Sequence, residues 1–508
     1  MAVAGLDPNL VLRVEQPASG STGTGPVLCR HAKPRSANRR SRCGVYTKQA
    51  AGEDSLRKLY WMLRCIPACL TFIAAVTGVA DGQSLIVQQP TVVARATLEQ
   101  PFDEPHLAVD PRDGDHWLAV AIVRGSAGTF PEELKDMICA SFTSVDGART
   151  WNRHDFPVTG CADPWVVLTD DGQAIASMIA ASSLFPGQGN SGLLVFHSKD
   201  GGLTWDDPPL GLGSGHDHTV IAIDRSESLR RGWIYISSNR SIHADDGLAR
   251  YGPWIARSRN AGTSFDDPVS VIPNNLRNLA EMPVVLSDGT LIVSYVDALY
   301  STERVDQLGT FERRRAWIVR STDGGRTFSA PLFVNDACGP PPGFRLSALA
   351  ADTSSRTFRD RLYFACREKG GGAIVVNHSS DRGERWSTPL SLNSPETAAG
   401  VEERIPGVTV NRDGVVAVAW IDGRTAAGHH CEESVFLTAS LDGGQTFLPP
   451  VRVSSTPACD DQARASRRPT GGDYFGLTAA ADGAFRLLWV EVRDSVKQLV
   501  TTTVRVGR

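Results

Sequence analysis

Successive segments of the chain each contain two apolar stretches. Charged residues, histidines and tyrosines recur directly before the first stretch and directly after the second. The first set is Glu104, His106, Asp163, His216, Asp217, His218, Glu281, Arg345, Glu402, Glu403, Arg404, Asp473 and Tyr474. The second set is Arg124, Arg240, Asp297, Tyr300, Arg367, Glu368, Asp422, Arg424, Glu491 and Arg493. Carboxylates can transfer protons, and guanidinium groups form paired, charge-assisted bonds to carboxylates. This chemistry suits the binding or the acid–base cleavage of a polar ligand.

The same residues also have structural interpretations. Charged residues at strand ends are commonly solvated or paired between neighbouring segments. His106, His216 and His218, together with Asp163, also allow a metal site, although histidines in loops are more often solvated. The sequence leaves these alternatives open.

A short phrase that recurs six times marks the elements that must position these residues. It reads SKDGGLTW at 198–205, STDGGRTF at 321–328 and SLDGGQTF at 440–447, with weaker copies at 144–151, 258–265 and 379–386. Its Ser hydroxyl and Asp carboxylate can bond the N–H groups of a tight turn, and its Gly can adopt a positive φ. Its last residue, Trp or Phe, can fill an apolar layer between sheets. The leading Ser recurs every 54 to 63 residues, which indicates a repeat architecture.

Each repeat predicts four short strands, with the phrase between the third and the fourth. Six repeats begin near residues 106, 163, 218, 282, 345 and 405, and a seventh begins at 474 but ends after its third strand. The segment 84–97 resembles the fourth strands, with Pro90 in the shared position, so we expect it to complete the seventh repeat. An open ring would leave two unpaired sheet edges. The sequence therefore predicts an all-β protein, a seven-bladed β-propeller of four-stranded antiparallel blades closed by the N-terminal strand.

This topology assigns the loops to two faces of the ring. The turns after the first strands and the repeated phrases share one face. The loops after the second strands and the connections between blades share the other, which we call the loop-rich face. Ligand sites of propellers usually lie on that face around the central channel, where the two sets of charged residues are expected.

Composition bounds the class of protein, and the N-terminal segment favours export. The chain has 508 residues and a net charge of −4, which permits a large core and gives no sign of nucleic-acid binding. Residues 1–61 predict a disordered extension, and Met62 is a candidate translation start. An apolar run that ends at Ala80 predicts a signal peptide over 62–80, too short for a stable membrane span; an uncleaved anchor is the alternative. We expect residues 81–508 to be secreted or periplasmic.

Six cysteines remain in the predicted mature chain, and their even number suggests disulfides in an exported protein. Six cysteines allow fifteen pairings. The repeat map places all of them on or beside the loop-rich face and favours neighbours in sequence: 139–161, 338–366 and 431–459.

The repeated phrases resemble Asp boxes, the BNR repeats of the sialidase superfamily and other β-propellers. The resemblance covers 84–508 as a fold, and Arg404-Ile405-Pro406 resembles the RIP motif of the family. Sialidases have six blades and carry this motif in the first, whereas this sequence predicts seven blades and carries it in the sixth.

The resemblance also implies a set of site residues. Sialidases hold the carboxylate of the sugar with three arginines, attack with a tyrosine activated by a glutamate and protonate the leaving group with an aspartate. On this chain these roles imply Arg404, Arg345 and Arg367 for substrate binding, and Tyr474, Glu403 and Asp163 for catalysis, with Glu402 and Asp217 as alternatives for the last two.

The sequence thus predicts an exported sialidase-like BNR-repeat propeller that recognises or hydrolyses an extracellular glycan, as a glycoside hydrolase of the exo-glycosidase type if it is an enzyme. The alternative is a non-catalytic propeller that serves as a protein- or glycan-binding scaffold, which the displaced RIP motif favours. We expect a monomer whose partner is a glycan, a glycoconjugate or a protein, with no cofactor, no metal and no nucleic acid. Catalysis requires Arg404, Arg345, Arg367, Glu403 and Tyr474 to converge on one pocket.

Overall fold

The computed structural model describes residues 83–97, 100–124, 136–185, 191–243, 249–272, 278–300, 311–339, 346–369, 373–392, 401–426, 429–455, 471–493 and 496–507. These residues belong to one compact unit and form strands and turns, without a helix. No helix that could cross a membrane is found among them. The predicted extension 1–61 and signal peptide 62–80 lie outside the described residues.

Seven sheets contain all the strands. The first strands of the blades are β3 (Phe102–Val109), β7 (Thr159–Leu168), β11 (His216–Ile223), β15 (Asn278–Val285), β19 (Ala348–Ala351), β23 (Val401–Val410) and β27 (Gly476–Ala479). The second strands are β4 (Trp117–Val123), β8 (Ala174–Ala181), β12 (Ile234–His243), β16 (Leu291–Tyr300), β20 (Leu362–Arg367), β24 (Val416–Ala426) and β28 (Phe485–Arg493). The third strands are β5 (Ile138–Ser144), β9 (Ser191–Ser198), β13 (Ala249–Ser258), β17 (Phe311–Ser321), β21 (Ile374–Ser379), β25 (His429–Ser440) and β29 (Val496–Gly507). The fourth strands are β6 (Asn152–Asp155), β10 (Leu210–Ser214), β14 (Asp266–Ser270), β18 (Leu332–Asn335), β22 (Leu390–Leu392) and β26 (Val451–Arg452), and the N-terminal strands are β1 (Ser84–Val87) and β2 (Thr91–Ala94).

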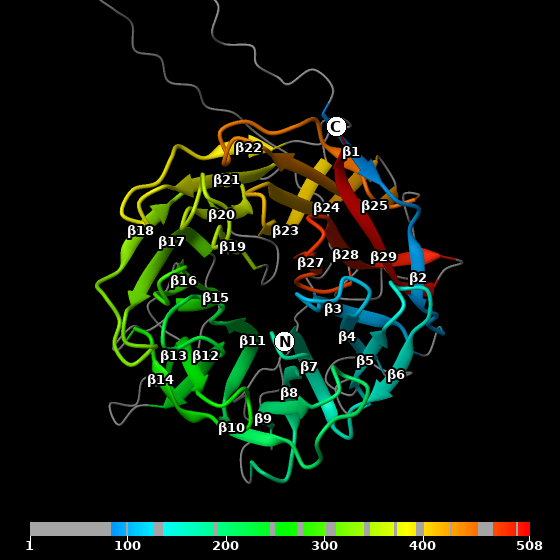
Figure 1. Ribbon diagram of the computed structural model, residues 1–508, viewed down its shortest axis with the longest axis vertical. Helices are drawn as coiled ribbons and strands as arrows, with labels where there is room; N and C mark the ends of the chain where they lie inside the picture. The colour runs from blue at the N-terminus through cyan, green and yellow to red at the C-terminus, as the bar shows by residue number, and fades with distance from the viewer. Residues whose placement is uncertain are drawn as a thin grey trace, which may run out of the picture. The chain divides into compact units, whose positions relative to one another are not determined.

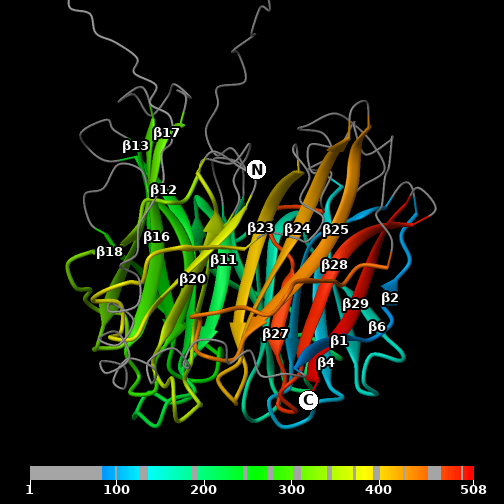
Figure 2. The same cartoon turned by 90° about the horizontal axis from the view of Figure 1, so that it is seen from above.

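The seven sheets stand around a central axis, as Figure 1 shows, with the first strand of each blade innermost. Within each blade, consecutive strands pair antiparallel, so the order in space follows the order in sequence. Figure 2 shows the blades from above, where β13, β17 and β25 extend beyond their neighbours on one side. The predicted seven-bladed β-propeller is confirmed.

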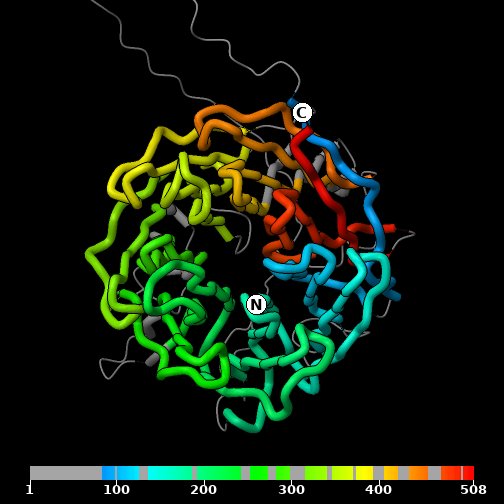
Figure 3. Tube along the Cα trace, in the orientation of Figure 1, coloured from blue at the N-terminus to red at the C-terminus, as the bar shows by residue number. Residues whose placement is uncertain are grey.

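The seventh blade is completed by the other end of the chain. Both β1 and β2 pair antiparallel with β29, the last strand, and Figure 3 shows the N-terminal segment beside it. The predicted closing strand is therefore real, but it is divided in two around Pro90, which has no N–H to donate to the ladder. Gln88 keeps the divided segment attached, since its N–H donates to the Thr503 carbonyl at 2.9 Å.

The six Asp boxes form the tight turns that the sequence predicts. In the box at 321–328, Ser321 Oγ accepts the N–H of Gly325 at 2.8 Å, and Asp323 Oδ1 accepts the N–H of Thr327 at 3.0 Å. Gly325 has a φ of +79°, which explains the glycine at this position. In the other five boxes the Ser Oγ likewise accepts the N–H of the residue four positions later. Its hydroxyl donates to the residue two positions later, which is Asp in four boxes and Asn260 in the box of blade three.

Each box also ties its blade to the preceding one. Trp205, the last residue of the second box, donates its indole N–H to Ser141 Oγ of blade one at 3.0 Å. In the same box, the Gly202 carbonyl accepts the hydroxyl of Thr143 at 2.7 Å, and its Cα lies so close to Leu118 that a Cβ would meet that side chain at 2.6 Å. The boxes therefore stabilise the ring as well as the hairpins.

Two of the three predicted disulfides are present. Cys139 pairs with Cys161 and Cys338 pairs with Cys366, each between neighbouring blades. The third predicted pair falls outside the description, because Cys459 and the side chain of Cys431 are not described.

Candidate functional site

Five innermost strands carry a backbone irregularity at their loop-rich ends. The pairing register shifts between Asp103 and His106 in β3, and at the corresponding points of β7, β11, β15 and β23. At four of these shifts one residue other than glycine adopts a positive φ; these residues are Glu104 (50°), Asp163 (51°), His218 (50°) and Ile405 (23°). Such conformations cost about 1 to 3 kcal/mol each and gather at functional sites. The residues at these bulges therefore form a candidate functional site.

A relay of hydrogen bonds from blade to blade holds the bulges in place. The N–H of Glu104 donates to the Gly471 carbonyl of blade seven at 2.6 Å, and Glu104 Oε2 accepts the N–H of Asp163 at 3.1 Å. The carbonyl of Asp163 in turn accepts the hydroxyl of Thr219 in blade three at 3.1 Å. Because each bulge binds the next one, the strained conformations of blades one to three are fixed together.

A carboxylate and an imidazole meet at this ring. Asp163 Oδ1 lies 3.4 Å from His218 Nδ1, and the two side chains are only 12% and 9% exposed. The pair lies beside Tyr474, whose ring centroid is 5.7 Å from that of His218. A nearly buried acid next to an imidazole and a phenol can support proton transfer, because each of these groups can donate or accept a proton.

Tyr474 itself is 4% exposed, and its hydroxyl donates to the Pro164 carbonyl at 3.0 Å. Its ring packs at a tilt against Trp165, with the centroids 5.3 Å apart. The Tyr474 side chain therefore lies next to Pro164 and Trp165, with its hydroxyl already bonded to the chain.

His106 and Trp165 form the remaining wall of the cluster. Their rings stack with centroids 3.7 Å apart, and His106 Nδ1 accepts the N–H of Val166 at 3.4 Å. Burial lowers the pKa of His106 to about 3, so the ring is neutral near pH 7. Trp165 was not among the residues expected from the sequence. The sequence does contain a pattern that could have identified it: Trp165 directly follows Asp163-Pro164, just as His106 directly follows Glu104-Pro105 in blade one.

A cavity of about 250 Å³ runs along the axis below this cluster. Its walls come from the innermost segments of all seven blades and include His106, Trp165 and Tyr474. Most of its other described lining residues are aliphatic, and Arg225 is the one residue among them with a charged side chain.

The structure locates the other predicted site residues in part. Arg367 ends β20 and is half-buried beside the Cys338–Cys366 disulfide, where its carbonyl accepts the N–H of Gly339 at 2.9 Å. Glu403 and Arg404 belong to β23, opposite Asp422 and Ile421 in the register, but their side chains are outside the description. Arg345 lies outside the described residues. Of the six predicted residues, Asp163 and Tyr474 thus enter one cluster, and the convergence of the arginines stays a prediction.

The metal alternative finds no support in the described part of the chain. There, no three His, Cys, Asp or Glu side chains lie close enough to hold a metal ion. His216 Nδ1 instead bonds with Ser238 Oγ at 2.8 Å.

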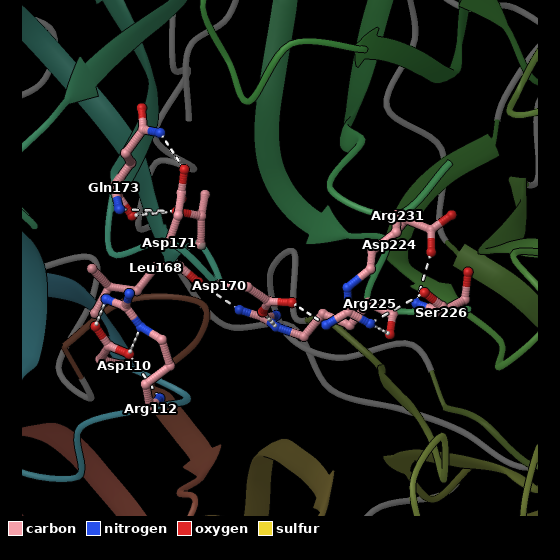
Figure 4. Close-up of polar contacts among 11 residues, drawn as sticks. Asp110, Arg112, Leu168, Asp170, Asp171, Gln173, Asp224, Arg225, Ser226 and Arg231 are labelled. Carbon is pink, nitrogen blue, oxygen red and sulfur yellow. Dashed lines mark hydrogen bonds and ion pairs between the residues drawn. The ribbon is translucent and has the colours of Figure 1, made fainter. Parts of the chain in front are cut away.

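On the opposite face, charged residues pair between blades. Figure 4 shows Asp170 of blade two between Arg225 and Arg231 of blade three, at 2.9 and 2.5 Å. All three side chains are more than a third exposed, so these pairs contribute little to stability. The structural interpretation of charged strand ends therefore holds on this face.

Seven four-stranded blades with six Asp boxes define an Asp-box β-propeller. A profile of the family described as the BNR repeat-like domain matches residues 216–486. Because this match covers more than half of the chain, the protein belongs to this family.

Among solved structures, the chain is similar to a protein of unknown function from Dyadobacter fermentans, with 12% identity and a TM-score of 0.47, over 83% of this chain and 99% of that one. It is also similar to the Hadza microbial sialidase Hz136 (18% identity, TM-score 0.43, 68% of this chain) and to Trypanosoma rangeli sialidase (14%, 0.40, 84%). The chain spans 65% and 60% of the length of these two sialidases. A search of curated proteins finds no match. Similarity at this level concerns the fold alone.

Proposed function

We propose that this protein is an exported propeller that binds a glycan at the loop-rich mouth of its channel and cleaves it as a sialidase-like glycoside hydrolase. One observation supports this function above the others. Asp163, His218, Trp165 and Tyr474, from three blades, meet beside strained bulges and above an axial cavity. Aromatic rings and acids of this kind suit the apolar and polar faces of a sugar.

The proposed chemistry follows the resemblance to sialidases. Glu403 accepts the phenolic proton of Tyr474 as the phenolic oxygen bonds to the anomeric carbon, and the glycosidic bond breaks as Asp163 gives its proton to the departing oxygen. Water that gives a proton to Asp163 then displaces Tyr474 from the sugar, and Tyr474 regains its proton from Glu403. Arg404, Arg345 and Arg367 hold a carboxylate of the sugar. A free phenol has a pKa of about 10, so the reaction requires a base beside Tyr474.

Export is part of the proposal. The two disulfides support it, because disulfides persist mainly in oxidising compartments. N-terminal sequencing of the protein released by the producing cell is expected to begin at Asp81; a chain that retains residues 62–80 would contradict the predicted cleavage.

The direct test uses residues 81–508 and a panel of fluorogenic glycosides that includes a sialoside. Hydrolysis of the sialoside is expected to fall by roughly 10³-fold or more in Tyr474→Phe. Tyr363→Phe is the matched control, because Tyr363 is also buried but lies in blade five, on the second strand, and its hydroxyl has no hydrogen-bond partner in the described structure. Turnover that survives Tyr474→Phe would reject Tyr474 as the nucleophile.

One observation favours the second candidate function, a non-catalytic binding scaffold. The hydroxyl of Tyr474 is nearly buried and already bonded to the Pro164 carbonyl, whereas a nucleophile must reach its substrate. If no glycoside is cleaved but immobilised glycans retain the protein, the scaffold is supported. Light scattering of the purified chain is expected to give a monomer in either case.

A further inference from the structure

Arginines recur where second strands reach the loop-rich face, and two of them have a carboxylate beside them. Arg124 Nε lies 3.1 Å from Asp103 Oδ2, and Arg493 Nε lies 2.9 Å from Glu491 Oε1. Arg240 of β12 differs, because no carboxylate of the described chain pairs with it; its Nε donates to a backbone carbonyl instead. A guanidinium that is partly withdrawn from water without a counter-charge is costly, and an anion that binds there lowers this cost.

The neighbours of Arg240 fix the orientation of its guanidinium. Nε donates to the Ser214 carbonyl at 3.2 Å, and Cζ lies 4.9 Å from the ring centroid of Trp254, so the indole covers one face of the group. Arg240 is half-buried, and burial lowers its pKa because the charged form loses water. These contacts leave the two Nη nitrogens, whose N–H groups match the two oxygens of a carboxylate in the plane of the guanidinium.

A buried histidine lies beside Arg240. His216 is 4% exposed, and its Nδ1 is bonded to Ser238 Oγ at 2.8 Å. Its Nε2 is buried and has no hydrogen-bond partner among the described residues. Burial and the charge of Arg240 lower the pKa of His216 to about 3, so the ring is neutral near pH 7. When the Ser238 hydroxyl donates to Nδ1, the proton of the neutral ring lies on Nε2, which then donates to an acceptor.

A glycine lies next to both side chains. A Cβ on Gly213 would lie 3.4 Å from Arg240 Nη2 and 3.5 Å from His216 Nε2, so the two nitrogens border the same small region. Gly213 has a φ of +116°, which other residues rarely adopt. The absence of a side chain at Gly213 keeps this region open to a group that approaches the two nitrogens.

From these contacts we propose that Arg240, His216 and Gly213 form a binding site for a carboxylate group, which we call the arginine site. The Nη nitrogens of Arg240 bind the two carboxylate oxygens, and His216 Nε2–H donates to one of them. A carboxylate supplies one negative charge for one guanidinium, and it can belong to a free small acid or to an acidic sugar.

The arginine site is separate from the sites already described. The described lining of the axial cavity includes neither Arg240 nor His216. None of the three arginines implied by the resemblance to sialidases belongs to it either. Binding at the arginine site therefore does not depend on glycan cleavage, and it can be measured whether or not the protein is an enzyme.

Two matched pairs of probes test the proposal and distinguish the two sources of the carboxylate. Benzoate is compared with benzamide, and methyl glucuronoside is compared with methyl glucoside; within each pair only the first carries a carboxylate. Ligand-observed NMR titration of residues 81–508 is expected to give a dissociation constant on the order of 1 mM for the acid that binds. The neutral member of that pair is expected to bind at least about tenfold more weakly. Preference for either acid supports the site, and the pair that shows it identifies the source.

Substitutions of Arg240 locate the binding. Arg240→Gln removes the charge and is expected to weaken the acid by about tenfold or more while it leaves the neutral probe unchanged. Arg240→Lys keeps the charge but lacks the paired donors, so we expect an intermediate loss of about threefold. Arg493→Gln is the matched control, because it removes the same charge from an arginine that already has a carboxylate partner. Thermal unfolding of each variant checks that the fold persists.

His216→Phe tests the second donor. This substitution keeps a ring at the position but has no N–H, and it is expected to weaken the acid by about threefold. Binding of the acid that His216→Phe leaves unchanged would exclude His216 from the site. Absence of any preference for the acids, a preference that survives Arg240→Gln, or an equal loss in Arg493→Gln would overturn the arginine site.

Discussion

Lys497 Nζ lies 3.2 Å from Asp103 Oδ1, although 394 positions separate the two residues in the sequence. Both side chains are buried, and Arg124 Nε reaches the other oxygen of Asp103 at 3.1 Å. The contact joins β29 of blade seven to β3 of blade one. The ring is thus closed twice, by the ladder of β1 and β2 on β29 and by a buried charged group between the first and last blades.

Removal of the carboxylate should destabilise this closure strongly. Asp103→Asn leaves the buried Lys497 and Arg124 without their common counter-charge, and loss of one partner of a buried pair costs about 3 to 5 kcal/mol. Urea unfolding is expected to show this loss. Asp155→Asn is the control: its pair with Arg153 is exposed on β6, so it should change the free energy of unfolding by about 1 kcal/mol or less. Equal effects of the two substitutions would show that Asp103 does not secure the ring.

The Cys139–Cys161 disulfide should contribute measurably to stability. It closes a loop with a sequence separation of 22 residues, for which chain entropy predicts about 3 kcal/mol. The double variant Cys139→Ser/Cys161→Ser is expected to unfold at correspondingly lower urea concentration. Thiol titration before and after reduction provides the check, since an exported wild-type protein should show free thiols from Cys139 and Cys161 only after reduction. An unchanged unfolding midpoint in the double variant would contradict the expectation.

Acid should weaken the Asp boxes. Bonds from the hydroxyl and the N–H of Thr150 lower the pKa of Asp146 from 3.8 to about 2. A carboxyl whose pKa is lower in the folded protein stabilises the fold above its unfolded pKa, and this contribution is lost as the pH falls from about 4 to about 2. The melting temperature should therefore decline across this interval.

Two substitutions in the boxes isolate this effect. Asp146→Asn removes one titrating group and should make the decline shallower. The box of blade three already contains Asn260 at the same position, so Asn260→Asp adds a group and should make the decline steeper. If neither substitution changes the slope, the boxes are not the acid-sensitive element.

Two substitutions of Asp163 separate its role in the strained backbone of the bulge from its proposed role as a proton donor. Its φ of 51° is tolerated better by Asn than by Ala, for which the left-handed region costs about 1 to 2 kcal/mol. Asp163→Asn should therefore unfold at a higher urea concentration than Asp163→Ala. Both variants lack the acid, so both should lose at least about 100-fold in hydrolysis of any glycoside that the wild type cleaves. An Asn variant with wild-type turnover would exclude Asp163 as the proton donor.

The blade plan can be read from the sequence because its signals are local. The Ser and Asp of each box bond N–H groups within four positions, and strand alternation recurs with every repeat, so boxes, blade number and the closing segment at 84–97 follow from the sequence. The pairings of Cys139 with Cys161 and of Cys338 with Cys366 follow as well, because the repeat map places each pair on adjoining loops.

The site depends on contacts that no local signal specifies. Tyr474 meets Trp165 and His218 because the ring brings blade seven around to blades two and three across the narrow axis. Glu104 and Asp163 have a positive φ at the bulges of neighbouring blades, and the bond from the N–H of Asp163 to Glu104 Oε2 joins the two bulges. The sequence by itself therefore determined the propeller and its blade order. Only the tertiary structure decided which side chains of distant blades touch, because the closed ring brings them together.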